Sequence, residues 1–496
     1  MKRFNIIFAL ICLVALSSCE TFLDKRPTNS GESASMIKTK GDAELAINGI
    51  MEKMISSSYL GRNMFLYADA KGGDLTIESQ GRGSDNLYTY GHSKTSGTYS
   101  GFWTVGYNVI MQLNNLIANI EKLQAEGSQE NFSDALGQAY TYRGMIYFDL
   151  VRLYGQPYNE DKTALGVPDV TEMLDAMAQV GRATVEQNYT TILSDLAKGA
   201  ELIGTAKNNG FINYYGNKAL QARVYLSMDK FAEALEAAEE VIGGPYKLYE
   251  PEEWVASWTQ EYGNESIFEL HINDDNNLSG SSLGAYYAAQ ADYGSCLGYF
   301  MASDYFMERL GEDPTDVRWG VMRDDLTQDS RNSEEDRLGA CYKYLGSVDK
   351  KGDNSDQNAG ACNIKVIRLS EMYLVAAEAA LRQSTPDKAL ACERLNAIRK
   401  RAPALEAATE ETITLDMILD EKSKELYGEG HRFWDMIRCN KTIEYNDEFP
   451  GITPIERGKT IDRTHFRTIL PIFESEINAN PTLETQQNPG YDGEEL

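Results

Sequence analysis

Aromatic, amide and charged side chains gather in two glycine-rich stretches of the chain, residues 68–101 and 273–300. The candidate contact residues are Tyr88, Tyr90, Tyr287, Tyr293 and Tyr299, together with Asp74, Arg82 and Asn86. Flat aromatic rings stack on sugar rings or peptide side chains, and the polar groups hydrogen-bond hydroxyl groups. These residue types therefore predict a ligand site between the two stretches. Because Tyr286, Tyr293 and Phe300 are seven residues apart, a buried stripe is the alternative.

One short pattern suggests hydrolytic chemistry. Residues 280–284 fit G-x-S-x-G, which would make Ser282 a nucleophile. A nucleophile elbow needs a strand before the serine and a helix after it. The Asn- and Asp-rich run at 273–277 does not predict a strand, so the pattern disfavours a hydrolase.

The same stretch half-matches a calcium-binding loop. Asp275, Asn277, Ser279 and Gly280 occupy its first, third, fifth and sixth positions, but Tyr286 replaces the bidentate glutamate. A weak calcium site stays open, and we otherwise expect no cofactor or metal. The chain has no H-E-x-x-H motif, Walker loop or Rossmann glycine pattern.

The N-terminus predicts export and lipidation. Lys2 and Arg3 precede an apolar run over 4–16, and Leu16-Ser17-Ser18-Cys19 resembles a bacterial lipobox. We expect a signal peptide at 1–18, cleavage before Cys19, and a diacylglyceryl group on its thiol that anchors the chain to a membrane. An ordinary secretory signal with an incidental cysteine is the alternative. No later segment has 18 consecutive apolar residues.

Amino-acid composition limits the classes of partner that the chain can bind. The 496 residues include 47 Lys and Arg against 75 Asp and Glu, a net charge of −28, which excludes nucleic acid as a favourable partner. With 29 Tyr but only 4 His, the chain suits a binding protein better than a metalloenzyme. The cysteines after Cys19 predict no disulfide framework or zinc site; they are Cys296, Cys341, Cys362, Cys392 and Cys439.

Helical periodicity dominates the rest of the chain. The predicted helical segments are 42–55, 102–123, 136–154, 184–203, 219–242 and 372–401, the last two each broken into a helix pair. At an offset of 155 residues, Ala222 matches Ala377 and Leu226 matches Leu381. Helix pairs of this length resemble tetratricopeptide repeats. The sequence thus predicts an all-α-dominated scaffold with long inserted loops and few short strands.

Four groups of residues together resemble the SusD/RagB family of outer-membrane nutrient-binding lipoproteins. They lie in the lipidated start at 19–27, the Arg- and Tyr-rich helix at 139–155, the run from Arg368 to Asp435, and the tail from Pro471 to Tyr491. One departure is the segment 420–424, which is more mixed in charge than the family's Arg-rich run. The resemblance spans nearly the whole chain. We expect an N-terminal region at 19–265 and a C-terminal region at 266–496.

The resemblance implies a tetratricopeptide-type scaffold whose loops bind a glycan, and a partner in the form of a TonB-dependent, SusC-like transporter. It implies an outer-membrane, surface-exposed location and no catalytic residues, with the segment at 429–432 a structural turn. A peptide receptor of the same architecture is the runner-up, and a surface glycan hydrolase is the alternative of a different class. No obvious Trp pair like that of starch binders lies in the two stretches, which argues against starch itself as the ligand.

Overall fold

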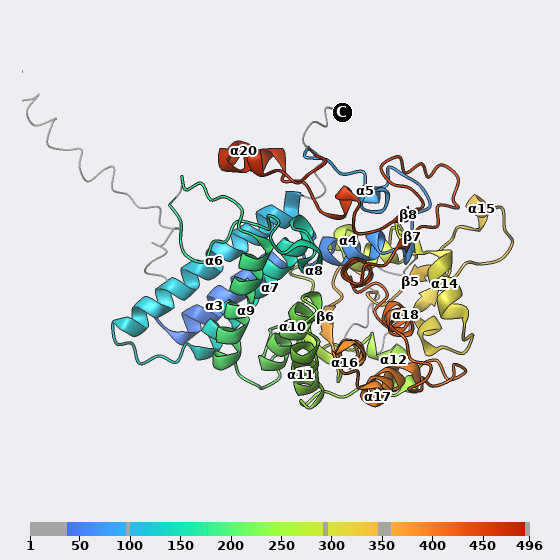
Figure 1. Cartoon of the computed structure of the whole chain (residues 1–496), viewed down its shortest axis with the longest axis horizontal. Coiled ribbons are helices and arrows are strands. Elements are labelled where there is room, and N and C mark those ends of the chain that lie inside the picture. The colour runs from blue at the N-terminus through green and yellow to red at the C-terminus, as the bar shows by residue number, and fades with distance from the viewer. Residues whose placement is uncertain (1–36, 96–99, 176, 291–295, 346–358, 492–496) are drawn as a thin grey trace, which may run out of the picture.

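The fold is a row of packed helices with a loop-rich flank (Figure 1). This computed structural model describes residues 37–95, 100–175, 177–290, 296–345 and 359–491. Cys19 and Tyr293 lie outside the described residues.

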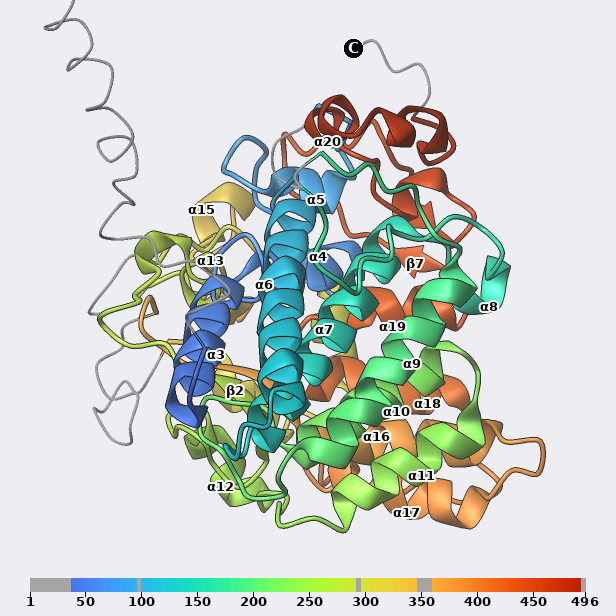
Figure 2. The same cartoon turned by 90° about the vertical axis from the view of Figure 1, so that its left-hand side faces the viewer.

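The row contains eight helices among the described residues. They are α3 (Lys40–Met54), α6 (Ser100–Ala125), α7 (Ser133–Tyr154), α9 (Val185–Leu202), α10 (Tyr214–Ser227), α11 (Phe231–Ile242), α16 (Leu369–Arg382) and α17 (Lys388–Arg399). Each packs on the next in this order (Figure 2), although α11 and α16 are far apart in sequence. The predicted helical scaffold is therefore confirmed.

Local signals in the sequence set the helix ends. Thr184 caps α9: its side chain accepts a hydrogen bond from the Gln187 backbone, and the Gln187 side chain bonds back to Thr184. This reciprocal box satisfies two backbone N–H groups that have no partner within the helix. Gly155 ends α7, and Pro157 follows two residues later, as the sequence predicts.

The repeat predicted from the 155-residue offset is present. Helices α10 and α16 both have 14 residues, and their first residues, Tyr214 and Leu369, are 155 positions apart. Ala222 and Ala377 are fully buried, each in a helix that packs on its repeat partner. A methyl group at these positions lets the paired helices approach closely.

The chain between α11 and α16 leaves the row and returns through a two-stranded ladder. Strands β2 (Ser266–Leu270) and β6 (Ile364–Arg368) pair antiparallel, and all ten residues are buried. The other ladders are β1 (Leu75–Thr76) with β3 (Met301–Ala302), β4 (Met322–Arg323) with β5 (Ala340–Cys341), and β7 (Ile443–Glu444) with β8 (Thr460–Ile461). Short antiparallel ladders thus hold the inserted segments in place by backbone hydrogen bonds.

Shorter helices fill the flank and the tail. The α-helices are α4 (Asn63–Lys71), α5 (Asp85–Thr89), α8 (Tyr158–Asp161), α12 (Pro251–Ser257), α13 (Leu283–Tyr287), α14 (Asp304–Gly311), α15 (Gln328–Arg331), α18 (Leu415–Glu425), α19 (Arg432–Arg438) and α20 (Glu474–Ala479). The 3₁₀ turns are η2 (Ser279–Ser281), η3 (Val317–Val321), η4 (Phe466–Thr468) and η5 (Pro481–Gln486). The predicted loops are therefore more ordered than expected, since long-range packing gives them short helices.

A large hydrophobic core runs from α3 to the C-terminal tail. Trp254 and Trp258 pack edge-to-face within it with ring centroids 5.8 Å apart. The five described cysteines form no disulfide bond with one another. None of the helices in the described ranges is long and apolar enough to cross a membrane.

Candidate functional site

The two glycine-rich stretches meet at one ladder. Leu75 of β1 pairs with Ala302 of β3, and Thr76 pairs with Met301. Because the pairing is antiparallel, the turn after β1 and the segment before β3 emerge at the same end. The predicted juxtaposition of 68–101 with 273–300 is present.

An aromatic and cationic cluster occupies that end of the ladder. Half-buried Tyr299 packs edge-on against Tyr286, with ring centroids 5.2 Å apart. The Arg62 guanidinium lies 4.2 Å from the centroid of the Tyr286 ring and donates to the Ser281 carbonyl. Gly83 lies beside both rings, since a Cβ there would be 3.6 Å from the Tyr286 hydroxyl. We call Arg62, Gly83, Tyr286 and Tyr299 the loop site.

Two polar candidates lie on the same turn. Arg82 is exposed and pairs with Glu78 at 2.8 Å, and Asn86 is half-buried in α5. Gly81 donates its backbone N–H to Asp85, which fixes the turn that presents them. Arg82 and Asn86 therefore stay candidates for contacts with ligand hydroxyl groups.

Tyr88 and Tyr90 are core residues, which corrects their selection as stacking faces. Both are fully buried. The Tyr88 hydroxyl donates to Asp447 at 2.6 Å, and the Tyr90 hydroxyl is 2.6 Å from that of Tyr445. Each ring packs edge-on against Tyr445, so neither presents a free face.

Tyr287 and Asp74 also lie away from the loop site. Tyr287 is 1% exposed and donates its hydroxyl to buried Asp69 at 2.9 Å. Asp74 is 3% exposed, lies at the opposite end of the β1–β3 ladder, and accepts hydrogen bonds from Arg309 and Ser423. Of the eight predicted contact residues, Tyr299, Arg82 and Asn86 remain in reach of a surface ligand, and Tyr293 is not described.

The motifs at 275–286 have structural roles. The Ser282 hydroxyl caps α13 by accepting from the Ala285 backbone, and it follows a 3₁₀ turn rather than a strand, so it is no nucleophile elbow. Asn277 accepts from the Ser279 backbone. Within the described part of the chain, no group of three His, Cys, Asp or Glu side chains could hold a metal ion.

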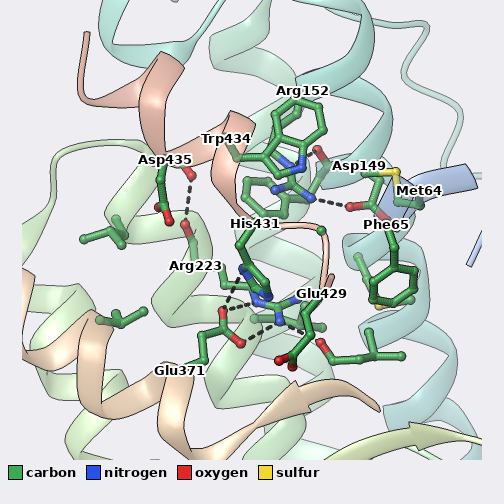
Figure 3. A pocket seen from close by; sticks show the side chains of 18 of the residues that line it. Met64, Phe65, Asp149, Arg152, Arg223, Glu371, Glu429, His431, Trp434 and Asp435 are labelled. Carbon is green, nitrogen blue, oxygen red and sulfur yellow. Dashed lines mark hydrogen bonds and ion pairs between the residues drawn. The ribbon is translucent and has the colours of Figure 1, made fainter. Parts of the chain in front are cut away.

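A separate, small pocket lies inside the scaffold (Figure 3). Its charges are paired: Arg152 donates to Asp149 at 2.5 Å, and Arg223 donates to both oxygens of Glu371 at 2.6 Å. Burial lowers the pKa of His431 to about 4 despite the nearby Glu371 carboxylate, so the ring is neutral at pH 7. We interpret this pocket as a structural ion network, because its pairs satisfy one another.

Two family models match the chain. One is described as the SusD family and matches residues 312–491, and the other is described as "Starch-binding associating with outer membrane" and matches residues 21–226. A crystal structure of a SusD superfamily protein from Bacteroides thetaiotaomicron has 32% sequence identity and a TM-score of 0.83, covering 91% of this chain and 100% of that one. The chain belongs to the SusD family.

Further relatives match over nearly the whole chain. A putative sugar-binding protein from Bacteroides vulgatus ATCC 8482 has 32% identity and a TM-score of 0.81, covering 92% of this chain and 100% of that one. SusD-like protein P2 from Formosa agariphila is 26% identical over 537 residues, 99% of this chain and all of the relative. The SusD-like fold therefore extends through both the row of helices and the flank.

Sequence reasoning missed two members of the loop site. Arg62 precedes both glycine-rich stretches, so local composition gave no signal for it. The alternative buried stripe is present in its described members, because Tyr286 is 8% exposed, Phe300 is fully buried and their rings stack with centroids 6.4 Å apart. The Tyr286 ring also contacts Arg62 and Tyr299, which the spacing does not indicate. The pairing of β1 with β3 is what brings these residues together.

One pair of carboxyl groups in this SusD family member could exchange a proton. Burial and a hydrogen bond with Asp304 raise the pKa of Glu448 to about 7. Arg337 donates to Asp304 at 2.8 Å, and this contact helps lower the Asp304 pKa despite burial. General acid–base catalysis uses such pairs, so this pair is the place to test for an enzyme.

Proposed function

We propose that the chain is an outer-membrane, surface-exposed lipoprotein that binds an oligo- or polysaccharide and delivers it to a TonB-dependent SusC-like transporter. The observation that carries the proposal is the loop site, where Tyr299 and Tyr286 lie beside Arg62 and the turn with Arg82. An aromatic face with hydrogen-bonding side chains around it suits a sugar ring. The starch-binding description of the matched model and the sugar-binding relative support this ligand class.

Removing the Tyr299 ring tests the site. We expect Tyr299→Ala to weaken polysaccharide binding about fivefold to tenfold, the loss of one stacking contact of about 1–1.4 kcal/mol. Retardation in gels containing starch, laminarin, xylan or pectin identifies a ligand, and calorimetry with it measures Kd. Tyr225→Ala removes another half-buried ring, on α10, and is the matched control.

The outcomes separate the candidate functions. Equal affinity of Tyr299→Ala and Tyr225→Ala, both folded, contradicts the loop site. Binding to a peptide library but to no polysaccharide favours the peptide receptor. Turnover of a bound polysaccharide by the wild type, lost in Glu448→Gln, favours the hydrolase, which the Asp304–Glu448 pair makes worth testing.

The lipid anchor has its own test. We expect Cys19→Ala to leave the chain unlipidated and to release it from the membrane fraction, because several acyl chains provide the predicted attachment. Fractionation after a high-salt wash, with an immunoblot, measures this. Cys296→Ala changes a half-buried thiol within the fold and is the control. A Cys19→Ala protein that stays in the membrane fraction excludes lipid anchoring.

A further inference from the structure

A groove opens at the other end of the β1–β3 ladder. It lies where α14 packs on α18 (Figure 1), with β7 and the start of α19 completing its walls. Asp74 and Ser303 flank this end of the ladder, whereas Gly83, Tyr286 and Tyr299 of the loop site lie in the segments that follow Thr76 and precede Met301. The groove is therefore a separate surface.

The floor of the groove is held together by its own charges. Arg309 donates to Asp74 at 3.0 Å and to Ser423 at 2.8 Å, and its Nε is 3.1 Å from Asp420. The Arg432 Nε, in a side chain only 10% exposed, is 3.6 Å from Asp74 and has no hydrogen-bond acceptor among the described residues. Two arginines thus face two carboxylates, and the floor has no excess charge.

Gly72 allows this tight floor. A Cβ on Gly72 would be 2.6 Å from the Arg432 Cβ, so a larger residue would displace the arginine. The close approach of Gly72 to the start of α19 fixes the position of Arg432 in the floor.

The rim of the groove, formed by Tyr305, Glu308 and Glu444, differs from the floor because its negative charges have no paired cation among the described residues. Tyr305 is 40% exposed, and Glu308 follows it by three residues on α14, which puts both on one face of the helix. Glu444 faces them from β7. No Lys or Arg among the described residues lies within ion-pair distance of Glu308 or Glu444, and both are exposed.

We propose that this groove binds an oligosaccharide unit that carries a protonated amine. The Tyr305 ring offers a stacking face, and Glu308 on α14 and Glu444 on β7 offer negative charge in the lining of the same groove. The net charge of −28 attracts cations to the surface, whereas an acidic glycan would be repelled. An amino sugar has donors around the edge of a ring whose C–H groups form an apolar face, which matches Tyr305 and the acceptors at Glu308, Glu444 and Thr442 better than a single lysine side chain does.

The inference rests on the proposed glycan-binding function but places a second, charge-selective subsite away from Tyr299. The probe is a tetramer of β-linked glucosamine at about pH 6, where its amines are protonated. The neutral counterpart is the N-acetylated tetramer. A lysine-containing peptide of equal charge is the third ligand.

Calorimetry on the full chain decides between the outcomes. We expect Tyr305→Ala and the double variant Glu308→Gln/Glu444→Gln each to raise the Kd for the glucosamine tetramer about tenfold, with weaker binding as salt increases. Glu236→Gln changes an exposed carboxylate on α11, outside both sites, and should leave that Kd unchanged.

Any one of four results overturns the proposal. The wild type does not bind the glucosamine tetramer, or it binds the N-acetylated tetramer with equal affinity. Alternatively, the groove variants leave the Kd of the glucosamine tetramer unchanged, or the peptide binds more tightly than the tetramer. Unchanged melting temperatures of the groove variants show that they are folded. Polysaccharide binding that depends on Tyr299 is measured separately, so the groove can fail while the loop site stands.

Discussion

Arg368→Met should destabilise the chain by about 3–5 kcal/mol, the largest effect we expect from one substitution. The guanidinium donates to Glu429 at 2.7 Å, to Glu265 at 2.9 Å and to Glu425 at 3.0 Å. It lies at the end of β6 and is 3% exposed. Without it, buried carboxylates lose a shared cation in a medium that solvates charge poorly.

The neighbouring cations cannot replace it. Arg401 pairs with Glu265 at 2.5 Å and also with Glu425, and Lys343 pairs with Glu429 at 2.7 Å. Each of these contacts already exists in the native structure, so the substitution leaves the network one positive charge short. The connection from β6 to α18 and to the turn before α19 should loosen with it.

A surface arginine gives the matched control. Arg394 donates to both oxygens of Glu239 at 2.7 and 2.8 Å, but the two side chains are 16% and 31% exposed. Arg394→Met should cost no more than about 1 kcal/mol, since water screens the pair. Denaturant unfolding compares the two variants, and Arg368→Lys extends the series if the methionine variant does not fold. Equal losses for Arg368→Met and Arg394→Met contradict the network argument.

The scaffold could be predicted because its signals are local. Helix α9 begins at a Thr–Gln capping box, and α10 and α16 repeat the same small and apolar positions 155 residues apart. Apolar residues at helical spacing determine a helix wherever it packs. The family resemblance rested on such segments, together with runs that the core and its ion network use.

The candidate site was only partly predictable, because burial depends on distant residues. Tyr88 lies among glycines and amides, which resembles an exposed loop, yet Tyr445 and Asp447 cover it from the far end of the chain. No residue near Tyr88 in the sequence indicates that Tyr445 and Asp447 are its partners. Tyr299 has a similar local composition but stays half-buried, with Tyr286 packed edge-on against it. Local composition therefore selected both rings, and only tertiary packing separates them.

Asp69 provides a pH-dependent test of the same packing. Its carboxyl accepts hydrogen bonds from the Tyr287 hydroxyl at 2.9 Å and from the Gly430 backbone at 3.0 Å. Burial raises its pKa to about 8, although both hydrogen bonds oppose the shift. The native state therefore keeps a proton that the unfolded state releases above about pH 4. By linkage, this carboxyl makes the chain less stable as pH rises from about 4 to 8.

His431 has the opposite effect on the pH dependence of stability over part of that range. The pKa of His431 is lowered to about 4 by burial, so the unfolded chain binds a proton there that the native chain does not, up to about pH 6.5. The two contributions oppose each other below about pH 6.5. Between about pH 6.5 and 8 the contribution of Asp69 stands without that opposition.

We therefore expect Asp69→Asn to remove a fall in stability between about pH 6.5 and 8, because the amide mimics the neutral carboxyl. The Asp69 contribution to this fall should reach at most about 1.4 kcal/mol per pH unit, the limit for one proton. Glu448, whose pKa is raised to about 7, adds a fall up to about pH 7 that the wild type and both variants share. Urea unfolding across this range measures the slope for the wild type, for Asp69→Asn and for Asp274→Asn, an exposed carboxyl in the 273–277 run. Of the two variants, only Asp69→Asn should make the slope of stability against pH shallower. If all three proteins share one slope, Asp69 is ionised in the native state, and the link that it forms between α4, Tyr287 and Gly430 is a charged one.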